Sequence, residues 1–345
     1  MLGLRRLLVL ACLSACDSEV ELHRELGRDI DVPVDLPPDD GWGHWQGSFT
    51  PCDEAAACAV GPSVRGELVV TSAVDIEALS GIRCLYGPLT IAGTDLEDLS
   101  GLEALEFVCG DLNITDNPSL VDTSGLGALS AAPRIKVLGN PSLVKLDLPA
   151  LGYVEHTIRI EQNATLTNLE LGALRKVWLL DVIDNGSLTA LLLPALEEAS
   201  RIAVEGAAAL TTLDVPALEQ LETLSLVDND SLTQISTFPS LAGPRWIVVR
   251  DNGALVSLAG LEAFASADGI VILNNVALDQ AYAEAVGAAL GGSTKIAGNA
   301  GWVVPATCPF RGDGQCDAIG CEGSAVCAEG SDEIDCCECL GLDCP

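Results

Sequence analysis

Residues 180–188 read LDVIDNGSL, and residues 224–232 read LSLVDNDSL, 44 positions further along the chain. The shared pattern LxIxxNxxL, in which other aliphatic residues replace the leucines and isoleucine, recurs along the chain with asparagine in one column. Thr94 and Ala207 stand in register at two positions of this column, and successive spacings are 22 to 24 residues. Self-similarity at a fixed period of this length is the signature of a solenoid. The asparagines of the column are Asn117, Asn140, Asn163, Asn185, Asn229, Asn252, Asn275 and Asn299.

Each repeat predicts one coil of parallel β-structure. In the LxI segment the two aliphatic side chains point inward and their neighbours point outward, as for Leu112 and Ile114. A second apolar rhythm follows in each coil, for example LVKLDLPAL at 143–151. The corner asparagine is expected to point inward and to hydrogen-bond to backbone groups that the turn leaves unpaired, so that stacked copies form a ladder.

We therefore predict an all-β fold. It is a right-handed parallel β-helix, or solenoid, of about eleven coils of 22–23 residues over residues 51–300, followed by a small disulfide-rich module. One coil cannot bury its apolar face alone, so stability must come from stacking. We call the sheet formed by the LxI segments the front sheet.

The two ends of the solenoid carry their own signals. In DQAYAEAVGAALGG (279–292), Leu278, Tyr282 and Val286 recur at helical spacing before Gly291, which predicts a helix closing the last coil. At the other end, disulfides are expected to cap the first coil. Four cysteines allow three pairings, and the sequence does not choose among them: Cys52, Cys58, Cys84 and Cys109.

The segments before the solenoid predict export and anchoring. Residues 1–15 combine Arg5 and Arg6 with an apolar run too short to span a bilayer, as in a signal peptide. The following Leu13-Ser14-Ala15-Cys16 resembles a bacterial lipobox, which implies lipidation of Cys16. Residues 16–50 are acidic and contain proline, which favours an extended tether. We expect an extracytoplasmic protein, lipid-anchored to the bacterial cell envelope at the outer membrane or cell surface. A plain signal peptide is one alternative, and Asp17 after Cys16, a signal for inner-membrane retention in some bacteria, leaves the inner membrane as another.

Charge and cysteine content restrict the partners and the compartment. The 345-residue chain has a formal net charge of −33, which becomes −35 once Arg5 and Arg6 leave with the signal peptide. Nucleic acid would be repelled, and membrane contact is expected through the lipid anchor only. Of 14 cysteines, Cys12 leaves with the signal and Cys16 takes lipid. The remaining even set favours disulfides in an oxidising compartment.

Two stretches carry a specific resemblance. VCGDLNITDNPSL (108–120) and LYGPLTIAGTDLEDLSGLEAL (85–105) resemble the receptor L domain, a leucine-rich-repeat-like β-helix of growth-factor receptor ectodomains and fungal surface proteins. The similarity covers most of residues 65–300. It implies the solenoid fold and a binding role, but no fixed ligand motif, because such domains bind through variable surface residues.

Residues 301–345 form a cysteine-rich tail with eight cysteines. The segment from Cys321 to Cys336 resembles the C-terminal half of an LDL-receptor class A module. That resemblance implies a calcium ion held by Glu322, Asp332 and Glu333, whose oxygen ligands suit Ca²⁺. Departures from the pattern, such as Val326 in place of an acid, leave a disulfide knot with a solvated acidic loop as the alternative.

No catalytic residues are predicted. The histidines are His23, His44 and His156, and the sequence lacks G-x-S-x-G, H-E-x-x-H and P-loop motifs. A polysaccharide-cleaving β-solenoid enzyme would need a basic proton acceptor. A central group of cations is the candidate, although charge balance on an acidic rod explains it better: Arg134, Lys136, Lys145, Arg159, Arg175, Lys176 and Arg201.

The outward positions of the front sheet predict the binding surface. Polar residues dominate the early coils and apolar ones the later coils, and exposed apolar residues rimmed by charge often mark an interaction site. Lys136 and Arg159 on earlier coils favour an acidic group on the partner. We predict a surface-anchored module that binds a protein or polysaccharide, with a structural spacer and a polysaccharide-cleaving enzyme as alternatives. The expected centre is Val227, Val248, Val271 and Leu273, with Arg250 at its rim; coverage of this face by the tether or tail is the competing interpretation.

Overall fold

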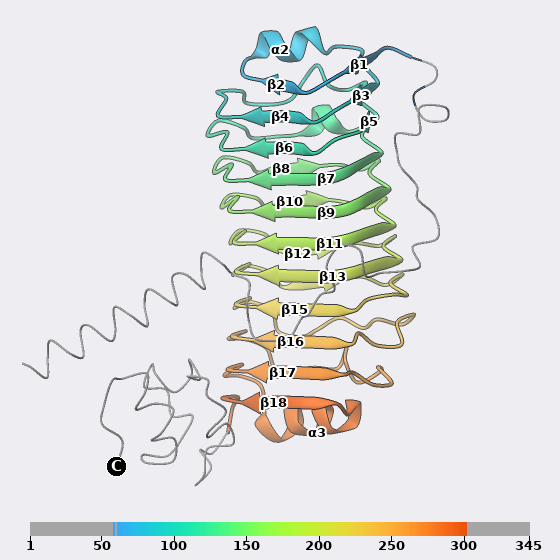
Figure 1. Ribbon diagram of the computed structural model, residues 1–345. Helices are drawn as coiled ribbons and strands as arrows, with labels where there is room; N and C mark the ends of the chain where they lie inside the picture. The colour runs from blue at the N-terminus through green and yellow to red at the C-terminus, as the bar shows by residue number, and fades with distance from the viewer. Residues whose placement is uncertain (1–57, 59–60, 302–345) are drawn as a thin grey trace, which may run out of the picture. The chain divides into compact units, whose positions relative to one another are not determined.

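The computed structural model describes Cys58 and residues 61–301, which form a parallel β-solenoid (Figure 1). Eleven strands built on the LxI pattern stack in one front sheet, so ten turns separate the first from the last. The predicted fold class is therefore confirmed for these residues. The eleven strands are β2 (Leu68–Val70), β4 (Leu89–Ala92), β6 (Leu112–Thr115), β7 (Ala131–Leu138), β9 (Tyr153–Glu161), β11 (Lys176–Ile183), β13 (Glu198–Glu205), β15 (Thr223–Val227), β16 (Trp246–Arg250), β17 (Gly269–Leu273) and β18 (Ser293–Ala297).

In the first coils the front strands are divided into two halves. The strands β1 (Ser63–Arg65), β3 (Cys84–Tyr86) and β5 (Phe107–Val108) precede β2, β4 and β6 and complete the 14-stranded sheet. Gly66, Gly87 and Gly110 lie at the division. A Cβ on Gly87 would lie 2.2 Å from the Gly66 carbonyl oxygen, so the coils approach there only because glycine has no side chain.

In the central coils the two halves merge into one long strand that bends at a β-bulge. The strand β9 carries one extra residue relative to both neighbours, and the register shifts between Ala132 and Arg134 of β7 and between Val177 and Leu179 of β11. A bulge bends a strand and re-aims the side chains beside it. The same change of direction is thus made by glycine in the early coils and by a bulge here.

The back of the solenoid contains the predicted second apolar rhythm. It includes β8 (Lys145–Asp147) with β10 (Asn168–Glu170), β12 (Ala190–Leu192) with β14 (Thr212–Asp214), and the short 3-10 helix η1 (Ser124–Leu126). The central leucines of these strands point inward, as Leu146 and Leu191 do with no exposed surface. On the front sheet Leu224 and Leu226 are equally buried. The core is a continuous aliphatic stack, and burying each such side chain contributes about 1.5–3 kcal/mol.

Both ends of the stack carry a helix. The predicted C-terminal helix is α3 (Gln280–Leu290), and it ends at Gly291, whose φ of 73° suits glycine. Its N-cap Asp279 accepts a hydrogen bond from the Tyr282 amide at 2.8 Å. Near the first coil lies α2 (Ala73–Ala78), with Ile76 buried. Among the described residues neither helix is long and apolar enough to cross a membrane.

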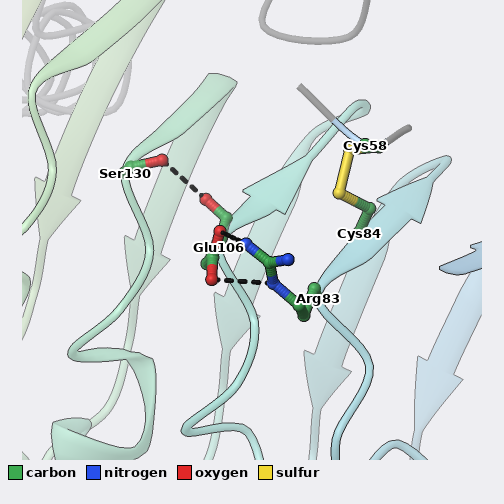
Figure 2. The surroundings of a disulfide bond; sticks show 5 residues. All are labelled: Cys58, Arg83, Cys84, Glu106 and Ser130. Atoms are coloured by element: carbon green, nitrogen blue, oxygen red, sulfur yellow. Dashed lines mark hydrogen bonds and ion pairs between the residues drawn. A yellow bond between two sulfur atoms is a disulfide. The ribbon is translucent and has the colours of Figure 1, made fainter. Parts of the chain in front are cut away.

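The first coils are also joined covalently and electrostatically. Cys58 and Cys84 form a disulfide, and Arg83 makes two hydrogen bonds of 2.8 and 2.6 Å to Glu106 of the next turn (Figure 2). Cys109 is disulfide-bonded as well. Disulfides at this end are thus confirmed, and the pairing of Cys58 is fixed.

Several predictions lie outside the described residues. They concern the signal peptide, lipidation of Cys16, the tether at 16–50 and the cysteine-rich tail with its calcium ligands Glu322, Asp332 and Glu333. The candidate site is therefore built from the solenoid.

Candidate binding surface

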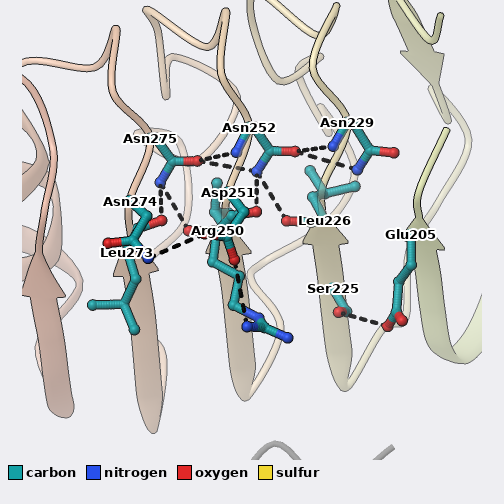
Figure 3. Close-up of polar contacts among 11 residues, drawn as sticks. Glu205, Ser225, Leu226, Asn229, Arg250, Asp251, Asn252, Leu273, Asn274 and Asn275 are labelled. Carbon is teal, nitrogen blue, oxygen red and sulfur yellow. Dashed lines mark hydrogen bonds and ion pairs between the residues drawn. The ribbon is translucent and has the colours of Figure 1, made fainter. Parts of the chain in front are cut away.

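The asparagine ladder fixes the geometry of the surface. All eight predicted asparagines are buried. In a typical rung, the Asn140 Oδ1 accepts hydrogen bonds from the Asn117 backbone amide at 3.1 Å and from its Nδ2 at 3.0 Å. The Asn140 Nδ2 donates to the carbonyls of Ile114 and Leu138. Figure 3 shows the same arrangement for Asn229, Asn252 and Asn275. Because each rung ties one corner to the next, the outward columns beside it stay in register.

The residue before each ladder position has a left-handed backbone conformation, which the repeat pattern did not predict. Its φ is 55° at Asp116 and 58° at Asp251, and glycine occupies the same column at Gly139 and Gly206. Asp, Asn and Gly tolerate this conformation best. The signal was present in the sequence as Asp, Asn or Gly preceding most ladder asparagines.

The ladder has one gap and one cap. At Ala207 only the backbone amide donates to Asn229 Oδ1, at 3.2 Å, and no side-chain amide is present to accept. At the far end, Gln280 of α3 takes the place of the next asparagine: its Oε1 accepts from Asn299 Nδ2 at 2.9 Å and its Nε2 donates to the Ile296 carbonyl. A side chain on a helix thus completes a network built by strands.

The predicted ligand residues lie in two adjacent outward columns. Strand pairing places Lys136, Arg159, Val248 and Val271 in one column and Val227, Arg250 and Leu273 in the other. The predicted register of the front sheet is therefore correct. The strands β11 and β13 lie between Arg159 on β9 and the first of the later residues, Val227 on β15.

The prediction of an exposed apolar centre is wrong at two of its residues. Val227 is only 7 % exposed and Val248 only 2 %, although both point away from the core. Val248 lies between Trp246 and Arg250 along its strand, and between Ser225 and Val271 across the sheet. Val271 and Leu273, on the next strand, remain partly exposed.

A charged cluster occupies the middle of this face. Arg201 contacts both carboxylate oxygens of Asp181 at 2.7 Å, and the Asp181 side chain is 4 % exposed. Ser225 donates a 3.5 Å hydrogen bond to Glu205 (Figure 3). Burial raises the pKa of Glu205, while the Arg201 and Arg250 charges oppose that shift. The Nε of Arg250 is buried without a hydrogen-bond partner among the described residues.

The central cations are mostly neutralised by acids on the same or neighbouring coils. Six of the seven residues in this group form ion pairs, which supports charge balance over a proton acceptor. Lys136 is the one member of the group for which the described structure shows no ion pair. The pairs are Arg134–Asp111, Lys145–Asp147, Arg159–Glu161, Arg175–Glu197, Lys176–Glu198 and Arg201–Asp181.

The described residues offer no deep ligand pocket. A cavity of about 10 Å³ lies inside the first coils, which is room for no more than a water molecule. Across residues 61–301 no three His, Cys, Asp or Glu side chains come together in a way that could hold a metal ion. The surface, rather than the interior, is therefore where this part of the chain can meet a partner.

Comparison with known proteins yields no match to any protein-family model or to any curated protein. The resemblances to receptor L domains and to LDL-receptor class A modules consequently stay predictions.

Proposed function

We propose that this protein is a lipid-anchored, extracytoplasmic binding module that recognises a protein or glycan through its front sheet. The observation that carries the proposal is the front sheet, whose outward columns are held in register by a buried asparagine ladder. These columns also present side chains that the described structure does not bury fully or pair with other groups. Val271 and Leu273 are partly exposed, and Lys136 has no ion pair among the described residues.

A rigid sheet suits recognition for an energetic reason. Its backbone is ordered before binding, so little conformational entropy is lost when a partner docks. Side chains in the outward columns can vary without changing the core, because strand neighbours point to opposite faces. Apolar contacts at Leu273 would supply affinity, and the charges around them would tune rate and selectivity.

The test compares two faces of the same solenoid. Full-length protein would be immobilised and exposed to solubilised envelope protein and polysaccharide from the cells that produce it. The double variant Lys136→Glu/Leu273→Glu should reduce retention of the bound component on the order of tenfold without lowering the melting temperature.

The matched control is Leu192→Glu on the back strand β12, where Leu192 is 49 % exposed. It should retain the same component as the unaltered protein. Equal retention by all three proteins would exclude the front sheet as the binding face, and no retained component at all would favour a structural spacer.

A further inference from the structure

We propose that the front sheet binds an uncharged glycan chain on an aromatic platform formed by Tyr153, His156 and Trp178. This inference rests on the proposed function and names a ligand class and a contact site for it. None of the three residues belongs to the apolar centre expected from the sequence. They lie instead on β9 and β11, at the bend of the central coils.

The β-bulge places these rings on the outer surface. Val154 and Val177, next to them in β9 and β11, point inward and are fully buried. The extra residue of β9 sets Glu155 and His156 opposite the single residue Trp178. The centroids of the His156 and Trp178 rings are 6.0 Å apart with an interplanar angle of 37°. All three platform residues are partly exposed. The paired rings of His156 and Trp178 form the shelf, and Tyr153 precedes the buried Val154 in register with Lys176.

Other aromatic contacts in the described chain have visible structural roles. Phe238 and Phe264 form a core pair and are 1 % and 5 % exposed. Tyr86 is covered by the Arg65 guanidinium, 4.6 Å from its ring centroid. Tyr282 is held by hydrogen bonds to Glu262 and Leu258. The His156–Trp178 pair differs because its rings lie together on the outer face of the front sheet.

Polar groups surround the rings in a way that suits sugar hydroxyls. Ser200 continues the His156–Trp178 column on β13, and Thr157 follows His156 on β9. Burial raises the pKa of Tyr153, an effect strengthened by the nearby carboxylates of Glu155 and Glu198, so its hydroxyl stays protonated. A sugar ring has an apolar face and a rim of hydroxyl groups. Aromatic rings can pack on the apolar face while neighbouring polar groups form hydrogen bonds with the hydroxyls.

The charges favour an uncharged ligand. Most cations near the platform are already committed, because Lys176 pairs with Glu198, Arg159 with Glu161 and Arg201 with Asp181. Among the described residues, Lys136 on β7, in register with Arg159, is a single exception. The chain as a whole carries a net charge of −33. An acidic polymer would meet this field without a cluster of free cations to offset it.

The repeat distance of the fold also matches a glycan. A pyranose ring in an extended chain advances by roughly 5 Å, close to the strand spacing of about 4.8 Å. A chain lying along the stack would therefore meet His156, Trp178 and Ser200 at nearly equal steps.

The test uses oligosaccharides of known charge. Isothermal titration of the full-length protein would compare cellohexaose and chitohexaose, which are uncharged, with hexagalacturonate, which is acidic. We expect at least one uncharged probe to bind and hexagalacturonate to bind on the order of tenfold more weakly. Trp178→Ala and His156→Ala should each weaken that binding several-fold, with Trp178→Ala approaching tenfold. The melting temperature of each variant would be measured in parallel.

Trp246→Phe, on β16 of the same sheet, is the matched control and should bind like the unaltered protein. If Trp178→Ala fails to fold, His156→Ala and Trp178→Leu, which keeps an apolar side chain but removes the ring, carry the test, and unchanged affinity in both overturns the platform. Stronger binding of hexagalacturonate overturns the choice of an uncharged ligand. Retention of an envelope component without binding of either uncharged probe overturns this inference and leaves the proposed function intact.

Discussion

At the scale of the residue, one amide side chain repeated eight times sets the register of the protein. Each typical ladder asparagine accepts from the previous coil and donates to carbonyls of its own and the previous coil, as Asn140 does. A buried polar group without such partners costs about 1–3 kcal/mol. The ladder is therefore both a stabilising network and a strong selector of one register.

The ladder gap gives a prediction of increased stability. Ala207→Asn should supply an acceptor for Asn185 and a second donor to Asn229 Oδ1, because Asn185 Nδ2 now contacts only the carbonyls of Ile160 and Ile183. We expect the free energy of unfolding to rise by about 1 kcal/mol, measured by chemical denaturation. A decrease would mean that the corner at Ala207 has no room for an amide.

Removal of an existing ladder asparagine tests the same network in the opposite direction. Asn185→Ala should lower the free energy of unfolding by about 1–3 kcal/mol, since it removes the acceptor of the Asn163 backbone and side-chain amides and the side-chain donor to the Ile160 carbonyl. Asn113→Ala is the control, because Asn113 points outward and makes only a 3.5 Å contact to Thr90. Similar losses in both variants would contradict the register described here.

The buried carboxylate of Glu205 predicts a pH dependence. Burial raises its pKa above the usual 4.5, so its contribution to stability is present below pH 4.5 and is lost as pH rises through the folded-state pKa. Glu205→Gln removes this cost and should raise the melting temperature at pH 7 by about 2–4 °C for each kcal/mol regained. At a pH of about 4 the gain should vanish. Glu219→Gln, at an exposed position, should change neither value.

At the scale of the element, the helix α3 closes the stack with both apolar and polar groups. Val286 and Leu290 pack against the last coil, and Gln280 accepts from Asn299. Gln280→Ala should destabilise the protein by about 1–3 kcal/mol, measured by denaturation, because the final rung loses its acceptor. Glu284→Ala, which removes only the contact from Gln280 Nε2 to the neighbouring turn, should cost much less. Equal losses would assign the effect to the helix rather than to the ladder.

Most elements of the solenoid were predictable because the same 22- to 24-residue period governs both the pattern of apolar residues in the sequence and the stacking of the coils. The LxI strands, the inward asparagines and the closing helix all follow from the spacing of apolar residues. The bulge in β9 was not predictable, since an extra residue between Val154 and Ile158 looks like ordinary variation in coil length. The burial of Val248 was missed for a related reason: a pattern gives the direction of a side chain but not the height of the neighbours around it.

At the scale of the whole molecule, the proposed anchor makes a direct prediction. Cys16→Ser should abolish lipidation and move the protein from the membrane fraction to the soluble fraction after detergent-free washing, as followed by immunoblotting. The solenoid should melt at the same temperature in both forms, because residues 61–301 do not include the anchor. A membrane fraction unchanged by the substitution would exclude the lipoprotein proposal.

The proposed calcium site in the tail is tested separately. If Glu322, Asp332 and Glu333 bind Ca²⁺, calorimetry of the oxidised full-length protein should show calcium uptake. The triple variant Glu322→Gln/Asp332→Asn/Glu333→Gln keeps the size of each side chain but removes its charge, so it should lose that uptake. In a chelator, the unaltered protein should lose protease resistance after residue 301 and keep it in the solenoid. Equal calcium uptake by the variant would exclude these three ligands.

The equal spacing of the coils also gives the protein a unit of length. Each coil pairs only with the coil before and the coil after it, from β2 to β18. Gain or loss of one whole repeat would change the contacts of the two flanking coils only, and would alter the length of the front face by about 4.8 Å. Such a protein can lengthen or shorten in evolution by whole coils, so the length of its front sheet can match that of a binding partner in fixed increments.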